Sequence, residues 1–228
     1  MEQTFMKEKK ILPLVLSMSL PMMLSMLVNS LYNIVDSYFV AQISEQAMTA
    51  LSLVYPLQLL ETAIAVGFGI GINAAAAFYL GAGERKNAND VVTSGILLSI
   101  VHGIVLTLFS IGFARYFVGM FTDQQPILED AVKYAWIVFA FTIPNVVAIT
   151  FEKIFQAEGR MKVSMISMLC GCVVNIILDP MLIFGIGFFP KMGIAGAALA
   201  TGIGQMATVV LYVGIYIIRP ISVKISIC

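Results

Sequence analysis

The chain has 228 residues, of which 60% are hydrophobic and 11% are charged, and its formal net charge is zero. Soluble domains carry about 25% charged residues, so this composition excludes an ordinary soluble domain and indicates a protein that crosses a membrane several times. With zero net charge and no basic stripe outside the connecting segments, nucleic acid is not expected as a partner.

Six long and weakly charged stretches each reach the roughly 20 residues that a helix needs to cross a bilayer. They lie at 11–39, 51–80, 92–118, 132–151, 163–186 and 194–218. The first stretch runs on past the length of a signal peptide without a clear cleavage site, so we expect a retained helix. The sequence therefore predicts an all-α membrane protein with an N-terminal segment over 1–10, a six-helix bundle over 11–218 and a tail over 219–228.

The basic residues test this count, because successive connecting segments alternate between the two sides of the membrane. Ten of the thirteen Lys and Arg fall on the side of the termini: Lys7, Lys9, Lys10, Arg85, Lys86, Lys153, Arg160, Lys162, Arg219 and Lys224. The other side has Arg115, Lys133 and Lys191. Since Lys and Arg accumulate in cytoplasmic loops, the bias predicts a multi-pass protein of the cell (inner or plasma) membrane with both termini in the cytoplasm.

Polar side chains interrupt the first three predicted spans. Asn33 and Asp36 are three residues apart and share a helix face near the outer end of span one. Glu61 lies near the middle of span two, where it either binds a cationic substrate or makes a local polar contact. His102 is the single histidine, and a lone imidazole inside a span is more often a packing residue than a proton relay.

The fifth span contains Asn175, Asp179 and Pro180. A charged side chain in the middle of a span costs about 3 kcal/mol, so such residues usually face a bundle interior or a water-filled cavity. Pro180 has no N–H and leaves the carbonyl of Ile176 free beside the carboxylate, which favours cation coordination. The alternative is that Asp179 only fixes the packing of neighbouring helices.

Thr201 in the sixth span lies at a depth similar to that of Asp179 and Asp36, in the outer half of the membrane, because each helical residue rises about 1.5 Å. If the three helices meet there, then Asp36, Asn175, Asp179 and Thr201 form a cluster of hard oxygen donors that suits Na⁺ or a shared proton. Two close carboxylates in such a site cannot both stay ionised, so one should hold a proton near neutral pH. We expect no other metal and no cofactor.

Several motifs together resemble the multidrug and toxic compound extrusion (MATE) family of transporters. They are Leu20-Pro21, Leu31-Tyr-Asn-Ile-Val-Asp36, Leu51-Ser-Leu-Val-Tyr-Pro56, Leu80-Gly-Ala-Gly83, Gln156-Ala-Glu-Gly-Arg160, Asn175-Ile-Ile-Leu-Asp-Pro-Met-Leu-Ile-Phe-Gly185 and Met192-Gly-Ile-Ala-Gly-Ala-Ala-Leu-Ala-Thr201. Glu61 matches none of the family's motifs.

The resemblance implies a secondary active antiporter, not an enzyme, in which Na⁺ or H⁺ drives multidrug efflux of amphipathic and often cationic xenobiotics. It also implies that Asp36, Asn175, Asp179 and Thr201 bind the coupling cation, with Asn33 and Glu61 as secondary or substrate-binding candidates. Family members are similar to a fold of two related six-helix bundles in the lipid bilayer. This chain matches the first, so we expect it to be an N-terminal half that needs a second bundle or another copy.

Three alternatives remain at this stage. A flippase for lipid-linked saccharides would share the fold, but its cavity would carry Lys or Arg for phosphate, and no span of this chain has one deep inside. An intramembrane aspartyl protease would use two aspartates on separate spans, but it would require a Gly-x-Gly-Asp motif where this chain has Leu178-Asp179-Pro180. A half bundle with a purely structural role would show no ion-dependent flux.

Overall fold

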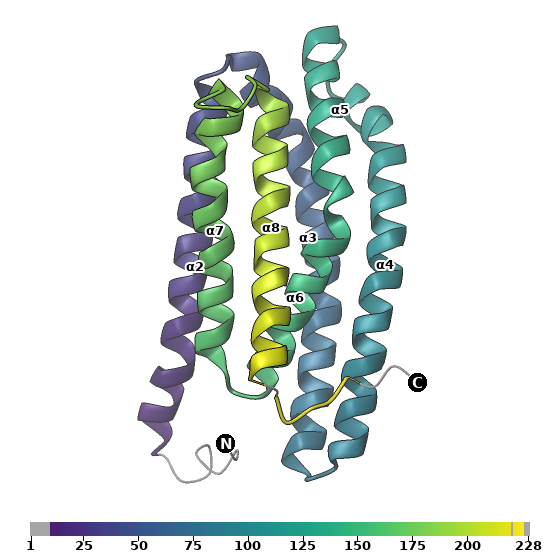
Figure 1. The fold of residues 1–228 in the computed structure, drawn as a ribbon. Coiled ribbons are helices and arrows are strands. Elements are labelled where there is room, and N and C mark those ends of the chain that lie inside the picture. The colour runs from purple at the N-terminus through teal and green to yellow at the C-terminus, as the bar shows by residue number, and fades with distance from the viewer. Residues whose placement is uncertain (1–9, 220, 226–228) are drawn as a thin grey trace.

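The protein forms a bundle of long helices, seen in a computed structural model that describes residues 10–219 and 221–225 (Figure 1). This part of the chain contains seven helices and no strand: α2 (Ile11–Ala41), α3 (Glu45–Gly81), α4 (Arg85–Gly119), α5 (Gln125–Ala140), α6 (Thr142–Ala157), α7 (Met161–Phe184) and α8 (Ile194–Ile218). The predicted all-α membrane fold is confirmed. Residues 1–9, 220 and 226–228, which belong to the predicted N-terminal segment and tail, lie outside the described residues.

Five of the helices, namely α2, α3, α4, α7 and α8, are long and apolar enough to cross a membrane. The fourth predicted span differs from the structure, because the segment over 132–151 is divided between α5 and α6, which meet at Phe141 at an angle of 48°. Pro144 lies in the first turn of α6, where a helix has no internal acceptor for the missing N–H, so the proline favours a helix start here. Counted as one bent span, α5 and α6 bring the total in the described chain to six.

The start of α2 and the end of α8 lie at the same end of the bundle, which we call the terminal end (Figure 1). The loop over 185–193 between α7 and α8 lies at the opposite end. Ser44 caps α3 at that opposite end, where its side chain accepts a hydrogen bond of 3.0 Å from the N–H of Ala47. Gly185 ends α7 in the left-handed conformation at φ 75°, which glycine adopts without steric cost.

Small residues bring α7 and α8 close together. A Cβ on Gly196 of α8 would lie 2.6 Å from the backbone of Leu182, and a Cβ on Gly204 would lie 2.8 Å from the carbonyl oxygen of Gly171. Since real Cβ contacts of this kind do not occur, the two helices can approach this closely only through glycine. α2 packs on the other side of α7 (Figure 1), so α7 is the central helix of a three-helix group.

The interior consists of two apolar cores with polar residues between them. The core towards the opposite end includes Val40, Val54, Tyr134, Ile183 and Ala198. The core towards the terminal end includes Ala76, Ala88, Phe155, Tyr212 and Val223. The buried polar residues between the cores, which we call the polar layer, include Asp36, Glu61, Ser99, Thr150, Asn175, Asp179 and Thr201.

The segment over 221–225 crosses the terminal end of the bundle from α8 towards α4 (Figure 1). Its Ile221 and Val223 are buried, and the N–H of Val223 donates a hydrogen bond of 3.1 Å to Oε1 of Glu158. The N–H of Lys224 donates to Oδ1 of Asn89 at 2.8 Å. Burial raises the pKa of Glu158, whereas the Val223 N–H and the Arg160 guanidinium favour its ionised form and oppose that rise. This segment is therefore docked on the bundle.

Candidate functional site

The structure brings together the four residues that the sequence predicts as a cation site. Asp36 comes from α2, Asn175 and Asp179 come from α7, and Thr201 comes from α8. All four are buried, and Asp179 has no exposed surface. They meet because α2 and α8 pack on α7, whose residues 175 and 179 share one face at the i, i+4 spacing. We call this group the aspartate cluster.

Asn175 is the hydrogen-bonding centre of the aspartate cluster. The two ends of an amide have nearly the same shape, so we assign the orientation that satisfies both of its neighbours. In this orientation the amide nitrogen donates to Oδ2 of Asp179 at 3.2 Å, and the amide oxygen accepts from the backbone N–H of Thr201 at 3.1 Å. The amide group also lies 3.4 Å from the hydroxyl oxygen of Thr201. Asn175 thereby ties α7 to α8 beside the carboxylate.

The carboxyl groups of Asp36 and Asp179 lie close enough to each other in the polar layer for their charges to interact. Two buried carboxylates this close repel each other, so a cation or a proton between them would stabilise the pair. Among the described residues, the buried Oδ1 of Asp36 has no hydrogen-bond partner. A buried acceptor without a partner costs about 1–3 kcal/mol, and a cation placed between the two carboxyl groups would remove that cost.

The donor set fits a small hard cation. Two carboxyl groups, an amide oxygen and a hydroxyl provide oxygen ligands only, which suit Na⁺ or a proton better than a soft metal. The described residues contain no group of three or more His, Cys, Asp or Glu side chains that could hold a metal ion. Cys170 and Cys172 are free thiols on α7, and neither joins the cluster.

A cavity of about 120 Å³, which we call the polar cavity, begins at the aspartate cluster and runs along α6, α7 and α8 towards the terminal end. Its wall includes Asn29, Tyr32, Asn145, Glu152, Met168, Cys172, Asn175, Thr201, Gln205, Thr208 and Tyr212. Asn175 and Thr201 therefore belong to both the cluster and the wall. Glu152 is the one wall residue with an ordinarily charged side chain.

Two further residues predicted from the sequence lie outside the cluster. Asn33 is exposed on α2, and its side chain donates to the backbone oxygen of Asn29 at 2.7 Å. Glu61 is buried in α3, where its Oε1 accepts a hydrogen bond of 3.2 Å from Asn145 of α6. Asn145 lines the polar cavity, so Glu61 contacts a residue of the cavity wall without lining the cavity itself.

His102, for which the sequence favours a packing role, stacks on Phe68 with ring centroids 4.5 Å apart. Its Nδ1 lies 2.7 Å from the carbonyl oxygen of Leu98, one turn earlier in α4. Both contacts stay within the α3–α4 side of the bundle, away from the aspartate cluster.

Sequence reasoning missed Tyr32, Tyr134, Glu152 and Gln205 as site residues. Tyr32 and Tyr134 lie close enough to both aspartates for their charges to interact. Tyr32 precedes Asp36 by one helical turn, so the i, i+4 spacing could have placed it on the same face. Glu152 follows Asn145 by two turns on α6, but it lies just past the end of the predicted span and was read as part of a connecting segment.

Comparison with known proteins decides the family, because the MatE family model matches residues 21–181. The chain belongs to the MatE family. This match includes Asp36, Asn175 and Asp179 and confirms the resemblance read from the motifs. Because MatE proteins are transporters, the prediction that the chain is not an enzyme is also confirmed.

Two curated MatE relatives give the range of named activities. A multidrug export protein, MepA of Staphylococcus haemolyticus, is 30% identical over 206 residues, which cover 90% of this chain and 45% of MepA. An FAD transporter of Shewanella oneidensis is 28% identical over 191 residues, covering 82% of this chain and 41% of that protein. The chain thus spans less than half the length of these relatives.

Solved structures of MatE relatives have the same fold. A MOP superfamily transporter from Pyrococcus furiosus superposes with a TM-score of 0.87 at 27% identity, covering 93% of this chain and 46% of that one. An outward-facing multidrug resistance MATE family transporter superposes with a TM-score of 0.86 at 27% identity, covering 93% and 47%. The prediction of a MATE-like bundle is confirmed.

Proposed function

We propose that this chain forms one six-helix half of a secondary active transporter that exports amphipathic, often cationic, compounds in exchange for Na⁺ or H⁺. The observation that carries the proposal is the buried contact between Asp36 and Asp179, with the amide of Asn175 and the hydroxyl of Thr201 beside it. Such a buried pair is costly unless a cation occupies it for part of the cycle.

The coupling cation would act through the charge of this pair. With a cation bound, the two carboxyl groups carry a single net negative charge, and α2, α7 and α8 can stay packed around them. When the cation leaves, two buried negative charges repel each other at close range, which favours a rearrangement that admits water or a new cation. Because the pair joins α2 to α7, this repulsion acts between helices.

The charges inside this bundle favour export of a cationic rather than an anionic compound, although the polar cavity is too small to hold the compound itself. The one ordinarily charged residue of the cavity wall is Glu152, and the other polar groups of the wall are amides, hydroxyls and phenols. A flavin dinucleotide or a lipid-linked saccharide carries phosphates, which proteins usually bind with Lys or Arg. The substrate of MepA is therefore a better guide to this chain than that of the FAD transporter.

We propose that the terminal end faces the cytoplasm. Arg85 and Lys86 at the α3–α4 turn, Arg160 and Lys162 at the α6–α7 turn, and Arg219 after α8 all lie at this end. The positive-inside rule places such an end in the cytoplasm of a cell-membrane protein. The aspartate cluster then lies in the outer half of the membrane, and the polar cavity extends inward from it.

A second six-helix bundle would complete the transporter, since the chain spans less than half the length of its relatives. The partner would be the missing half of a longer chain or another copy of this one. A half bundle without transport activity is the alternative, and the flux measurement separates it from the proposal.

The test is efflux of a fluorescent organic cation from cells that express residues 1–228, with imposed Na⁺ or pH gradients. Asp36→Asn and Asp179→Asn each remove one of the two carboxylates that would hold the cation. We expect gradient-dependent efflux to fall at least about a hundredfold in both, while membrane insertion stays normal. Asp123→Asn, in the exposed α4–α5 connection, is the matched control.

Three outcomes have different meanings. Efflux that is lost in both cluster variants and kept in the control supports a working antiporter built from this chain. Normal efflux in both cluster variants overturns the proposed site. No efflux from the inserted wild-type chain assigns it the role of an incomplete half, and the two substitutions are then tested in a transporter with both bundles.

A further inference from the structure

The end of the polar cavity nearest the terminal end contains a carboxylate that the proposed function does not use. Glu152 lies on α6 two turns beyond Asn145, so it is about 10 Å from Asn145 along the helix axis. Its side chain is 16% exposed, and it lies close enough to Tyr212 of α8 for their charges to interact. The polar cavity therefore has an acid near this end, while its other end adjoins the aspartate cluster through Asn175 and Thr201.

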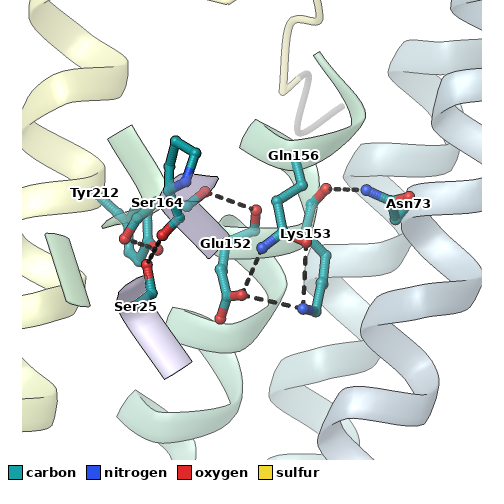
Figure 2. A network of polar contacts seen from close by, with 8 residues as sticks. Ser25, Asn73, Glu152, Lys153, Gln156, Ser164 and Tyr212 are labelled. Carbon is teal, nitrogen blue, oxygen red and sulfur yellow. Dashed lines mark hydrogen bonds and ion pairs between the residues drawn. The ribbon is translucent and has the colours of Figure 1, made fainter. Parts of the chain in front are cut away.

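The contacts of Glu152 are unevenly divided between its two oxygens. Oε1 accepts hydrogen bonds from Nζ of Lys153 at 3.0 Å and from Nε2 of Gln156 at 2.6 Å. Oε2 accepts no hydrogen bond from any described residue. Figure 2 shows this network, in which Lys153 and Gln156 lie on one side of Glu152 while Ser164 and Tyr212 lie on the other.

The simplest role for Glu152 is a structural ion pair with Lys153. That ion pair accounts for the contacts of Oε1 but gives no role to Oε2. A second acceptor in the same cavity, Oε1 of Gln205, is buried and has no partner among the described residues. The unpartnered Oε1 of Gln205, together with the carboxylate of Glu152 in the same wall, indicates a cationic or hydrogen-donating occupant of the polar cavity, since buried acceptors are nearly always satisfied. The hydroxyl of Thr208 and the phenol of Tyr212 provide further oxygens in the same wall.

The volume of the cavity decides the size of that occupant. A cavity of about 120 Å³ has room for a few waters, each of which occupies about 30 Å³ in the liquid. Drug-sized ligands need cavities of about 300–1,000 Å³. The occupant is therefore a small hydrated cation or a protonated water, and not the exported compound.

We propose that Glu152 forms a second binding position for the coupling cation, reached from the aspartate cluster through the polar cavity. The oxygens of Gln205 and Thr208 would complete the ligand set with Oε2 of Glu152. The ammonium of Lys153 competes with the cation for the same carboxylate and so keeps the affinity low enough for release. This inference rests on the proposed cation coupling. It places an intermediate binding position for the cation on the cytoplasmic side of the aspartate cluster.

The test measures equilibrium binding to the purified full chain in detergent, with radioactive Na⁺ in one arm and proton uptake, followed with a pH indicator, in the other. We expect Glu152→Gln to lose roughly half of the bound cation, because one of two anionic positions is gone. Lys153→Met should tighten the remaining weak binding about tenfold, because the competing ammonium is removed. Glu129→Gln, an exposed residue of α5, is the matched control.

Gln205→Leu provides a second test, because it removes one cavity oxygen and leaves the ion pair between Glu152 and Lys153 intact. This substitution should weaken cation binding at the Glu152 position. Unchanged stoichiometry and affinity in Glu152→Gln and Gln205→Leu would overturn the inference, while loss in Asp36→Asn and Asp179→Asn would still support the proposed function. If the wild-type chain binds neither Na⁺ nor protons, both proposals are wrong. Binding of radioactive Na⁺ would identify Na⁺ as the cation at this position, and proton uptake would identify H⁺.

Discussion

At the scale of single residues, the aspartate cluster combines groups that are costly to bury separately. Asp179 is fully buried, and its neighbours are the carboxyl group of Asp36 and the amide of Asn175. Thr201 contributes both its backbone N–H and its hydroxyl to the same amide. The neutral side chains thus hold the acids in place, and only the acids change charge.

Thr201→Val tests the hydroxyl without changing the shape of the side chain. The backbone N–H of residue 201 still donates to Asn175, so the helices remain tied, but one oxygen donor is lost. A single hydrogen bond contributes about 1 kcal/mol, so we expect the half-saturating cation concentration to rise about fivefold. The measurement is cation titration of the purified protein, and Thr201→Ser should restore the wild-type value. Equal half-saturating cation concentrations for Thr201→Val and the wild-type protein would show that the hydroxyl is not a cation ligand.

The sequence was sufficient to predict the four cluster residues, because polar side chains in apolar spans can be placed by depth alone. Glu152 could not be predicted in this way. It lies beyond the end of the predicted fourth span, which stops where the charged pair Glu152-Lys153 begins, whereas α6 continues to Ala157. Loss of apolar character along the sequence therefore does not mark the end of this helix.

At the scale of helices, glycine contacts determine how closely α7 and α8 approach. Gly196→Ala would place a Cβ 2.6 Å from the backbone of Leu182, which cannot move aside as a side chain would. Overpacking of this kind costs about 1–3 kcal/mol, so we expect a lower thermal unfolding midpoint in detergent. Gly67→Ala has no described atom within 4 Å and should leave the midpoint equal or higher. Equal midpoints for the two variants would show that α7 and α8 do not pack this tightly.

The break between α5 and α6 shows why proline positions alone did not predict the bend. Pro21, Pro56 and Pro180 lie inside α2, α3 and α7, which continue through them. Pro144 coincides with a break because Phe141, three residues earlier, leaves the helical conformation at φ −98° and ψ 9°. The ring of Phe141 packs directly on Gly202 of α8, where no larger residue fits. That contact is tertiary and has no signal in the sequence of the bend itself.

At the scale of the whole molecule, the docked segment over 221–225 closes the terminal end of the bundle. Glu158→Ala removes the acceptor of the buried Val223 N–H, a loss worth about 1–3 kcal/mol. We expect backbone amide exchange at Val223 and its neighbours to become at least about fivefold faster, measured by hydrogen–deuterium exchange. Glu84→Ala, exposed at the α3–α4 turn, is the control. Unchanged exchange in Glu158→Ala would mean that apolar burial alone holds the segment.

The architecture of one bundle was predictable from the sequence because six apolar stretches and the asymmetry of Lys and Arg leave few alternatives. The polar layer was only partly predictable. Ser99 and Thr150 form a buried hydrogen bond of 2.6 Å between α4 and α6, and the sequence gives no sign that these two hydroxyls meet. Such contacts depend on which helix faces are neighbours, which periodicity in a nearly uniform apolar span does not define.

The sharing of one cation by Asp36 and Asp179 is tested most directly by infrared difference spectroscopy of the carboxyl C=O stretch in the purified chain. We predict a protonated-carboxyl band that disappears when Na⁺ is added or the pH is raised, and that is absent from both Asp36→Asn and Asp179→Asn. Glu61→Gln, which changes a buried acid outside the cluster, should leave this band in place. A cation-sensitive band that persists in both aspartate variants would show that these two residues do not form the coupling site.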